Sequence, residues 1–278
     1  MEQLFRRHNR FFISLIFLHI IIMSFFSLFS FAHTKAKVAN ALTNSGYIIM
    51  DAKTYKVLDG ENYDARLPMA STTKIMTALI VIENSNLEEK IRIDDRAVGV
   101  EGSSVYLKQG EILSIMDLLY CMMLRSGNDS ATALALHLAK DVKSFAEMMN
   151  IRAKSMGLTN TNFTNPHGLH DDNHYTSCYD LCLISCIAMH NPVFQQIVNT
   201  KNITIGSGNS KRYLINKNKF LNLYEGGNGI KTGYTKKSGR CLVSSAERNG
   251  KKLVAVVLNN YDTYNVSMQL MDKAFNNL

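Results

Sequence analysis

Three short motifs carry the residues of this sequence that are best suited to chemistry: Ser71-Thr72-Thr73-Lys74, Ser126-Gly127-Asn128 and Lys231-Thr232-Gly233. Ser71 and Lys74 lie three positions apart, so at the start of a helix their side chains project from the same face. A serine hydroxyl becomes a good nucleophile only when a base takes its proton, and a lysine is such a base when burial or a neighbouring cation lowers its pKa. The spacing therefore predicts Ser71 as nucleophile and Lys74 as its general base, with Lys231 as the neighbouring cation.

The second motif follows an apolar stretch that ends at Leu124 and precedes another predicted helix. A loop in that position can present a hydroxyl and an amide to a cleft. We expect Ser126 to relay a proton between Lys74 and a leaving amine, and Asn128 to bind a backbone carbonyl of the substrate. Without the other motifs, the same residues would indicate only a turn.

The third motif lies beside a predicted strand, whose edge could pair with an extended peptide. Lys231 and Thr232 would then be placed to bind a carboxylate. Gly233 lacks a side chain, so that two backbones can approach closely there. When it occurs alone, S-x-x-K is also typical of a serine that caps a helix N-terminus, followed one helical turn later by a surface lysine. K-T-G alone is typical of an exposed turn. The three motifs together favour an acyl-transferring serine enzyme.

Histidines offer an alternative chemistry, because His167, His170 and His174 lie near Asp171 and resemble a loose metal cluster. A polar loop near the cleft fits this pattern better. No G-x-S-x-G motif accompanies the histidines, which argues against a serine hydrolase that uses histidine as its base.

The composition is that of a globular protein, with 46% hydrophobic and 19% charged residues among 278 and no low-complexity tract. This length fits one domain with a large core once an apolar N-terminal segment is removed. The net charge of +8 would suit an anionic polymer, but the basic residues are scattered and are not interleaved with aromatic ones. We therefore expect no nucleic-acid binding and mostly ordinary solvated charge.

The N-terminus has the pattern of an export signal. Arginines within residues 6–10 precede a run without charged residues at 11–31, which is long enough to span about 30 Å as a helix. We expect a signal peptide cleaved after Ala32, with an uncleaved membrane anchor as the alternative. In either case the body of the protein is exported, to the periplasm or the outer face of the cytoplasmic membrane. We assign residues 1–36 to this segment and 37–278 to the catalytic domain.

Export makes the five cysteines relevant, because an oxidising compartment permits disulfides and an odd number leaves at least one thiol free. Cys178, Cys182 and Cys186 recur every fourth residue and would lie along one helical stripe. No histidine at ligand spacing joins them, and their neighbours are apolar. We expect buried thiols there rather than a metal site.

Predicted strands lie at both ends of the body and predicted helices lie between them. We expect strands at 46–51, 55–58, 241–245 and 253–258, and helices at 71–84, through much of 114–190 and from about 262 to the end. This order suggests an α+β fold in which an antiparallel sheet, assembled from distant segments and flanked by helices, has an inserted helical subdomain. Catalytic groups would lie at their junction.

With all three motifs present, the sequence resembles the serine D-alanyl-D-alanine carboxypeptidases, which are low-molecular-mass penicillin-binding proteins of peptidase family S11. The resemblance covers about residues 45–260 and includes the blocks at 68–74, 125–129, 157–161, 165–169 and 229–235. It implies a serine β-lactamase-like fold, a peptidoglycan stem peptide as substrate and covalent inhibition by β-lactam antibiotics. It also implies an oxyanion hole formed by the backbone N–H groups of Ser71 and Tyr234, and no cofactor.

Two departures from the family pattern leave alternatives open. Larger members continue into a β-rich second domain and a C-terminal anchor, which we do not expect here, so any membrane attachment would use the N-terminus. Tyr234 stands where several carboxypeptidases have histidine, and residues 239–243 also resemble the endopeptidases that cut D-alanyl cross-links. A D-alanyl-D-alanine endopeptidase is therefore the nearest alternative, and an inactive peptidoglycan-binding or scaffolding protein is an alternative of another class. A class A β-lactamase is disfavoured because no acidic loop residue for deacylation is recognisable.

Overall fold

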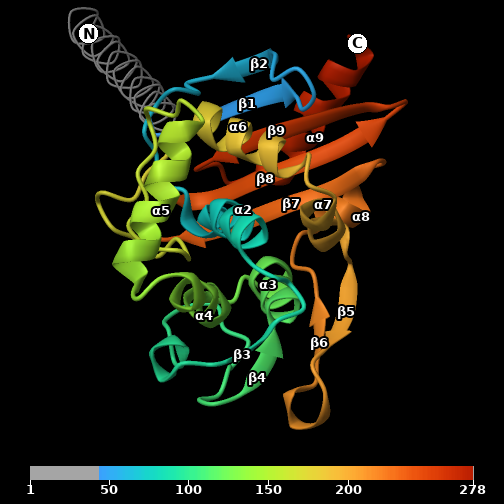
Figure 1. Ribbon diagram of the computed structural model, residues 1–278. Helices are drawn as coiled ribbons and strands as arrows, with labels where there is room; N and C mark the ends of the chain where they lie inside the picture. The colour runs from blue at the N-terminus through green and yellow to red at the C-terminus, as the bar shows by residue number, and fades with distance from the viewer. Residues whose placement is uncertain (1–43, 278) are drawn as a thin grey trace, which may run out of the picture. The chain divides into compact units, whose positions relative to one another are not determined.

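The computed structural model describes residues 44–277. The expected signal segment at 1–36 and the first residues of the expected catalytic domain lie outside this range. The described residues from Ser45 onward pack as one compact unit. Their centre is a five-stranded antiparallel sheet with helices on both faces (Figure 1).

The sheet joins the two ends of the described chain. Its strand order is β2-β1-β9-β8-β7, and its strands are β1 (Gly46–Asp51), β2 (Val57–Glu61), β7 (Gly227–Thr235), β8 (Gly239–Arg248) and β9 (Lys251–Leu258). β1 pairs with β9 along its whole length, with Tyr47 opposite Val257. The prediction of a sheet assembled from distant segments is thereby confirmed.

The second predicted strand, at 55–58, was placed about two residues too early. The Asp51 carboxylate accepts hydrogen bonds from the backbone N–H groups of Lys53 and Thr54 at 3.0 and 2.7 Å. The Asp51 N–H donates to the carbonyl of Lys56. These bonds extend the turn through Lys56, and β2 begins only at Val57.

The alternation of side chains along β9 explains why both faces of the sheet are covered. Val254 and Val256 belong to the larger core beneath the helices, whereas Leu253, Ala255 and Val257 belong to a second core beneath α9 (Thr263–Asn276). Because successive side chains point to opposite faces, a strand that is apolar at every position must be buried on both sides. Figure 1 shows α9 on one face of the sheet and α6 on the other.

Helices and two small two-stranded sheets fill the region between β2 and β7. The helices are α2 (Lys74–Asn84), α3 (Ile115–Arg125), α4 (Asn128–Leu138), α5 (Val142–Ser155), α6 (Cys178–Ala188), α7 (Pro192–Asn199) and the short α8 (Phe220–Leu223), and the small sheets pair β3 (Lys90–Arg92) with β4 (Ile112–Ser114) and β5 (Asn202–Ile205) with β6 (Arg212–Ile215). The expected helical subdomain is present. Residues 156–177, which fall inside the stretch predicted as mostly helical, instead form a long loop.

Within residues 44–277, no single helix is both long and apolar enough to cross a membrane. The helices α6 and α7 reach that length only as a pair, and the chain bends by 106° between them.

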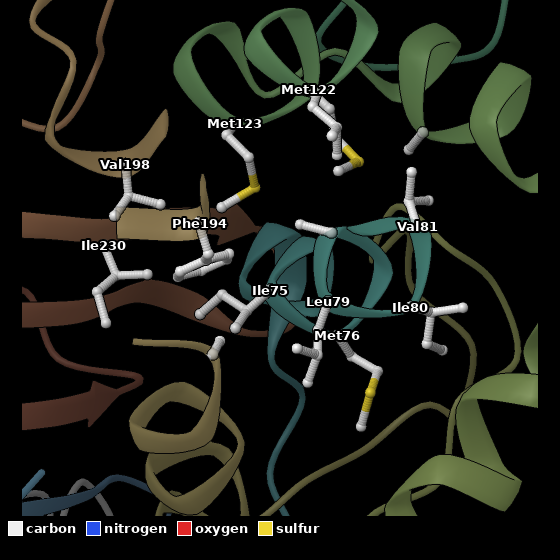
Figure 2. Close-up of a cluster of buried hydrophobic side chains, with 14 of the residues drawn as sticks. Ile75, Met76, Leu79, Ile80, Val81, Met122, Met123, Phe194, Val198 and Ile230 are labelled. Carbon is white, nitrogen blue, oxygen red and sulfur yellow. The ribbon is translucent and has the colours of Figure 1, made fainter. Parts of the chain in front are cut away.

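α2 lies at the centre of the larger core. Figure 2 shows apolar side chains of α2 facing Met122 and Met123 of α3, Phe194 and Val198 of α7, and Ile230 of β7. Ile75 on α2 is completely buried. Burial of one such side chain stabilises the fold by about 1.5–3 kcal/mol. The packing therefore holds the start of α2, with Ser71 and Lys74, in a fixed position against the sheet.

Candidate active site

Ser71 lies in a short 3-10 turn, Ala70–Thr73, which continues directly into α2. The α-helix thus begins at Lys74, three residues later than predicted. Lys74 Nζ lies 3.0 Å from Ser71 Oγ, within hydrogen-bond distance. The turn brings together the two side chains that the first motif predicts as nucleophile and base.

The completely buried Lys74 side chain has two further partners. Its Nζ donates to Asn128 Oδ1 at 2.7 Å and to the backbone carbonyl of His167 at 2.6 Å. These two oxygens can only accept, whereas the Ser71 hydroxyl can also donate. A neutral Lys74 amine has two hydrogens and one lone pair. Its hydrogens would occupy the two acceptors, and the lone pair would face the Ser71 hydroxyl.

The surroundings of Lys74 favour this neutral amine. Burial lowers the pKa of Lys74 well below its ordinary value, and the positive charges of Lys231 and Lys217 lower it further, while Asp129 acts in the opposite direction. The cationic influence of Lys231 agrees with the effect expected from the sequence. An uncharged lysine beside a serine is suited to remove the hydroxyl proton.

Ser126 and Asn128 flank the junction of α3 and α4. Ser126 adopts a left-handed backbone conformation with φ 64°, which ends α3 and turns the chain so that the residue lines the cleft. Asn128 is held on both sides, because its Nδ2 donates to the carbonyl of Glu101 at 2.6 Å and its N–H donates to that of Ser103 at 2.7 Å. Asn128 is only 4% exposed, and its Oδ1 is bonded to Lys74.

The third motif occupies the edge strand β7. Gly233 packs against the nucleophile turn so closely that an added Cβ would lie 3.1 Å from the backbone nitrogen of Ser71. Thr232 and Tyr234 line the cleft on either side of it, and Tyr234 is 66% exposed. Gly233 thus brings the backbone of β7 close to that of the nucleophile turn.

Lys231 is placed differently from its neighbours. It is only 2% exposed, and its Nζ donates to the carbonyl of Thr232 at 2.9 Å. Burial, together with the positive charge of Lys217, lowers the pKa of Lys231 to about 7. Lys231 does not line the cleft, and its positive charge acts on Lys74 within the protein interior.

An open cleft of about 390 Å³ runs along β7 above Ser71. It is also lined by residues outside the three motifs: Ser103, Lys217, Lys219, Arg240, Cys241, Thr263 and Tyr264. Three of these are cations, and no acidic side chain lines the cleft among the described residues. The cleft therefore suits a substrate with a negative charge.

Two of these cations have recognisable positions in the fold. Arg240 lies directly opposite Tyr234 in the pairing of β7 with β8. The sequence analysis predicted a strand at 241–245 but none at 227–235, so it did not place Arg240 opposite Tyr234. Lys217 reaches the cleft from the connection between β6 and α8, and its Nζ donates to Ser103 Oγ at 3.3 Å. No sequence motif indicated Lys217, because the β5–β6 hairpin that places it was not predicted.

The three histidines of the 165–174 loop point to different neighbours. The carbonyl of His167 binds Lys74, the His170 imidazole lies 3.3 Å from the Asp172 carboxylate, and His174 is buried against Thr73. Burial lowers the pKa of His167 to about 3 and that of His174 to about 4. Within residues 44–277, no cluster of three or more His, Cys, Asp or Glu side chains is arranged to hold a metal ion.

The sheet, the helical subdomain and a serine–lysine pair at their junction form the fold of the serine DD-peptidases. A family model described as D-alanyl-D-alanine carboxypeptidase matches residues 32–262. The chain belongs to this family, peptidase family S11, as its motifs predict.

Individual relatives agree with this assignment. The chain is 32% identical to the carboxypeptidase DacF of Bacillus subtilis over 216 residues, which are 76% of this chain and 56% of DacF. It is 30% identical to the D-alanyl-D-alanine endopeptidase of Escherichia coli over 241 residues, covering 82% of this chain and 77% of that protein. The crystal structure of a D-alanyl-D-alanine carboxypeptidase from Mycobacterium tuberculosis superposes with a TM-score of 0.80 at 30% identity, covering 83% and 90% of the two chains. The chain thus spans little more than half the length of DacF.

Proposed function

We propose that this protein is a serine-type D-alanyl-D-alanine carboxypeptidase that removes the terminal D-alanine from peptidoglycan stem pentapeptides and is acylated by β-lactams. The observation that supports this most strongly is the Ser71–Lys74 pair, in which two acceptor-only oxygens orient the lysine. The family assignment supplies the substrate class. The N-terminal sequence supports an exported protein that works in the periplasm or at the outer face of the cytoplasmic membrane.

In the proposed reaction the substrate lies along the edge of β7. Lys74 takes the proton of Ser71, whose oxygen bonds to the penultimate D-alanine carbonyl carbon while the backbone N–H groups of Ser71 and Tyr234 bind the developing oxyanion. Ser126 relays the proton to the leaving amine, the peptide C–N bond breaks and D-alanine departs. Water then hydrolyses the ester, which restores the Ser71 hydroxyl and releases the shortened stem peptide.

Recognition of the terminal carboxylate is assigned to the positively charged side of the cleft, where Arg240 lies. Thr232 and Arg240 both line it, and Arg240 is exposed. The buried Lys231 contributes its positive charge, and Gly233 lets β7 approach the turn that carries Ser71. Asn128 is assigned to bind a substrate carbonyl through its amide nitrogen, because its Oδ1 is already bonded to Lys74.

The test is intact-mass spectrometry of the purified protein after incubation with benzylpenicillin, with Ser71→Ala as the matched control. We expect a single penicilloyl adduct on the wild type, mapped to Ser71, and none on Ser71→Ala. A second incubation with a stem pentapeptide should release D-alanine from the wild type only. Full turnover by folded Ser71→Ala would contradict the assignment.

The endopeptidase remains the second candidate because a related E. coli protein carries that name. A cross-linked muropeptide dimer distinguishes the two activities. Cleavage of the dimer without release of D-alanine from the pentapeptide would assign the protein as an endopeptidase. The absence of any penicilloyl adduct would instead favour an inactive peptidoglycan-binding protein.

A further inference from the structure

We propose that His174 is a positioning residue for the nucleophile: acting through Thr73, its imidazole fixes the turn that carries Ser71 and Lys74. The inference rests on the proposed function, because it assigns His174 a role in acylation of Ser71. His174 does not line the cleft, and the proposed reaction does not use it.

Both ring nitrogens of His174 are engaged although the side chain is almost completely buried, at 3% exposure. Nε2 lies 2.7 Å from Thr73 Oγ1. The backbone N–H of Thr164 donates to Nδ1 at 3.0 Å. The ring also packs edge-on against Phe163, with 5.8 Å between centroids. These polar contacts are specific to a ring with a nitrogen on each side, and packing alone does not account for them.

The direction of these hydrogen bonds follows from their donors. Nδ1 accepts a hydrogen bond from a backbone N–H, so it carries no proton. Thr73 Oγ1 donates its only hydrogen to the carbonyl of Ala70 at 2.7 Å. Nε2 must therefore carry the proton and donate it to Thr73 Oγ1. A directed chain results, from Thr164 through His174 and Thr73 to Ala70.

This chain ends at the residue that precedes the nucleophile. Ala70 has φ 48°, a left-handed conformation that costs a residue with a side chain about 1–3 kcal/mol. Gly168 packs against the same carbonyl, where an added Cβ would lie only 1.9 Å from the Ala70 oxygen. The Ala70 carbonyl is thus held by Thr73 on one side and confined by Gly168 on the other.

The geometry explains why this restraint affects catalysis. Ala70 immediately precedes Ser71, and Thr73 immediately precedes Lys74, so the hydrogen-bonded chain fixes the backbone on both sides of the reacting pair. A displacement of about 1 Å at reacting groups can slow a reaction about 100-fold. Removal of His174 would let the turn relax and misalign Ser71 with Lys74, without removing any group that touches the substrate.

The experiment measures the second-order rate constant for acylation by benzylpenicillin, by intact mass at timed intervals, with the end-point adduct giving the active fraction. The variants are His174→Leu, His174→Gln, Thr73→Val and the double variant His174→Leu/Thr73→Val. The control is His170→Gln, which changes another histidine of the same loop. The His170 imidazole lies beside the Asp172 carboxylate and not beside Thr73. Thermal unfolding is recorded for every variant.

We expect His174→Leu and Thr73→Val each to slow acylation about 10- to 100-fold per active molecule. The double variant should lose little more than either single one, because both changes break the same chain. Glutamine offers an acceptor oxygen and a donor nitrogen with a spacing like that of the imidazole nitrogens, so His174→Gln should recover most of the rate. His170→Gln should acylate like the wild type.

Acylation of His174→Leu at the wild-type rate, with only its unfolding temperature lowered, would overturn the proposal and leave His174 as a core histidine. If His174→Leu does not fold, Thr73→Val decides, since a wild-type rate in that variant would equally overturn the proposal. Failure of the wild type itself to form an adduct would instead refute the proposed function.

Discussion

At the scale of single residues, the site depends on lysines that are prevented from being fully charged. Lys74 and Lys231 are both buried, and each has its pKa lowered first by burial and then by a neighbouring lysine. An exposed Ser–Lys pair would keep the amine protonated at neutral pH, because an unperturbed lysine has a pKa of about 10.4. Lys74 can therefore act as a base because its burial and the neighbouring cations lower its pKa.

The pH dependence of acylation tests this interpretation. Acylation needs neutral Lys74, so its rate should rise with pH as that residue loses its proton. In Lys231→Met a positive neighbour is removed, which raises the pKa of Lys74 and should move the acidic limb of the profile to higher pH. The measurement is the benzylpenicillin acylation rate from pH 5 to 9, with Lys236→Met, which changes an exposed lysine of the turn after β7, as control. An acidic limb in Lys231→Met that coincides with the wild type would show that Lys231 does not influence the base.

The role of Arg240 is tested with the substrate rather than with pH. Arg240→Ala should raise KM for the pentapeptide about 10-fold or more, since loss of one partner of a charged pair costs about 1.5–3 kcal/mol. A pentapeptide whose terminal carboxylate is amidated should be a poor substrate of the wild type. Arg240→Ala should discriminate much less between the two peptides. Equal discrimination by both proteins would assign the carboxylate contact to another residue.

At the scale of elements, the site is a meeting of four segments: the turn before α2, the α3–α4 junction, the 165–174 loop and β7. The loop acts on the site through its backbone as well as its side chains, because the carbonyl of His167 accepts a hydrogen bond from Lys74 and Gly168 packs against Ala70. A motif search finds side chains at fixed spacing and has no means of finding a carbonyl. That is why the sequence indicated the lysine but not what orients it.

Gly168 provides the corresponding test, with Gly157 as a matched control. Both have a positive φ, at 88° and 77°, but an added Cβ at Gly157 would meet nothing within 4 Å. Gly157→Ala should therefore lose only about 1–3 kcal/mol, the cost expected for the backbone conformation. Gly168→Ala should displace Ala70, lower the unfolding temperature further and slow acylation of the folded protein by at least about 10-fold. Equal effects in the two variants would indicate that the packing on Ala70 is unimportant.

At the scale of the whole molecule, the periodicity of the sequence predicted four strands of the sheet, β1, β2, β8 and β9, but not the edge strand β7. It failed where tertiary contacts decide. Residues 156–177 contain Pro166, two glycines and few apolar side chains, which already argues against a helix. Asp180 accepts from the N–H of Asn160 and the hydroxyl of Thr161, and the loop pairs with Leu67 through Thr176. Such contacts come from parts of the chain that no local window includes.

The five cysteines make a prediction about the whole fold. All are buried free thiols, and burial raises the pKa of Cys241, which lines the cleft, to about 11 and that of Cys121 to about 12. Because the thiolate is the reactive form, a thiol-specific reagent at pH 7 should modify none of them in the folded protein. In denaturant all five should react, which controls for prior oxidation. Rapid labelling of Cys241 in the native state would show that the cleft wall opens.

The pairing of β1 with β9 has a consequence for how the chain acquires activity. These strands are separated by about two hundred residues of sequence, yet they lie side by side at the centre of the sheet. Contacts between such distant segments form slowly, because a long loop must close before they stabilise the chain. A nascent chain that already contains Ser71 and Lys74 still lacks β7 and β8, against which the turn before α2 packs. The active site therefore forms only after the C-terminal strands have been synthesised, and a shorter nascent chain should not be acylated by a β-lactam.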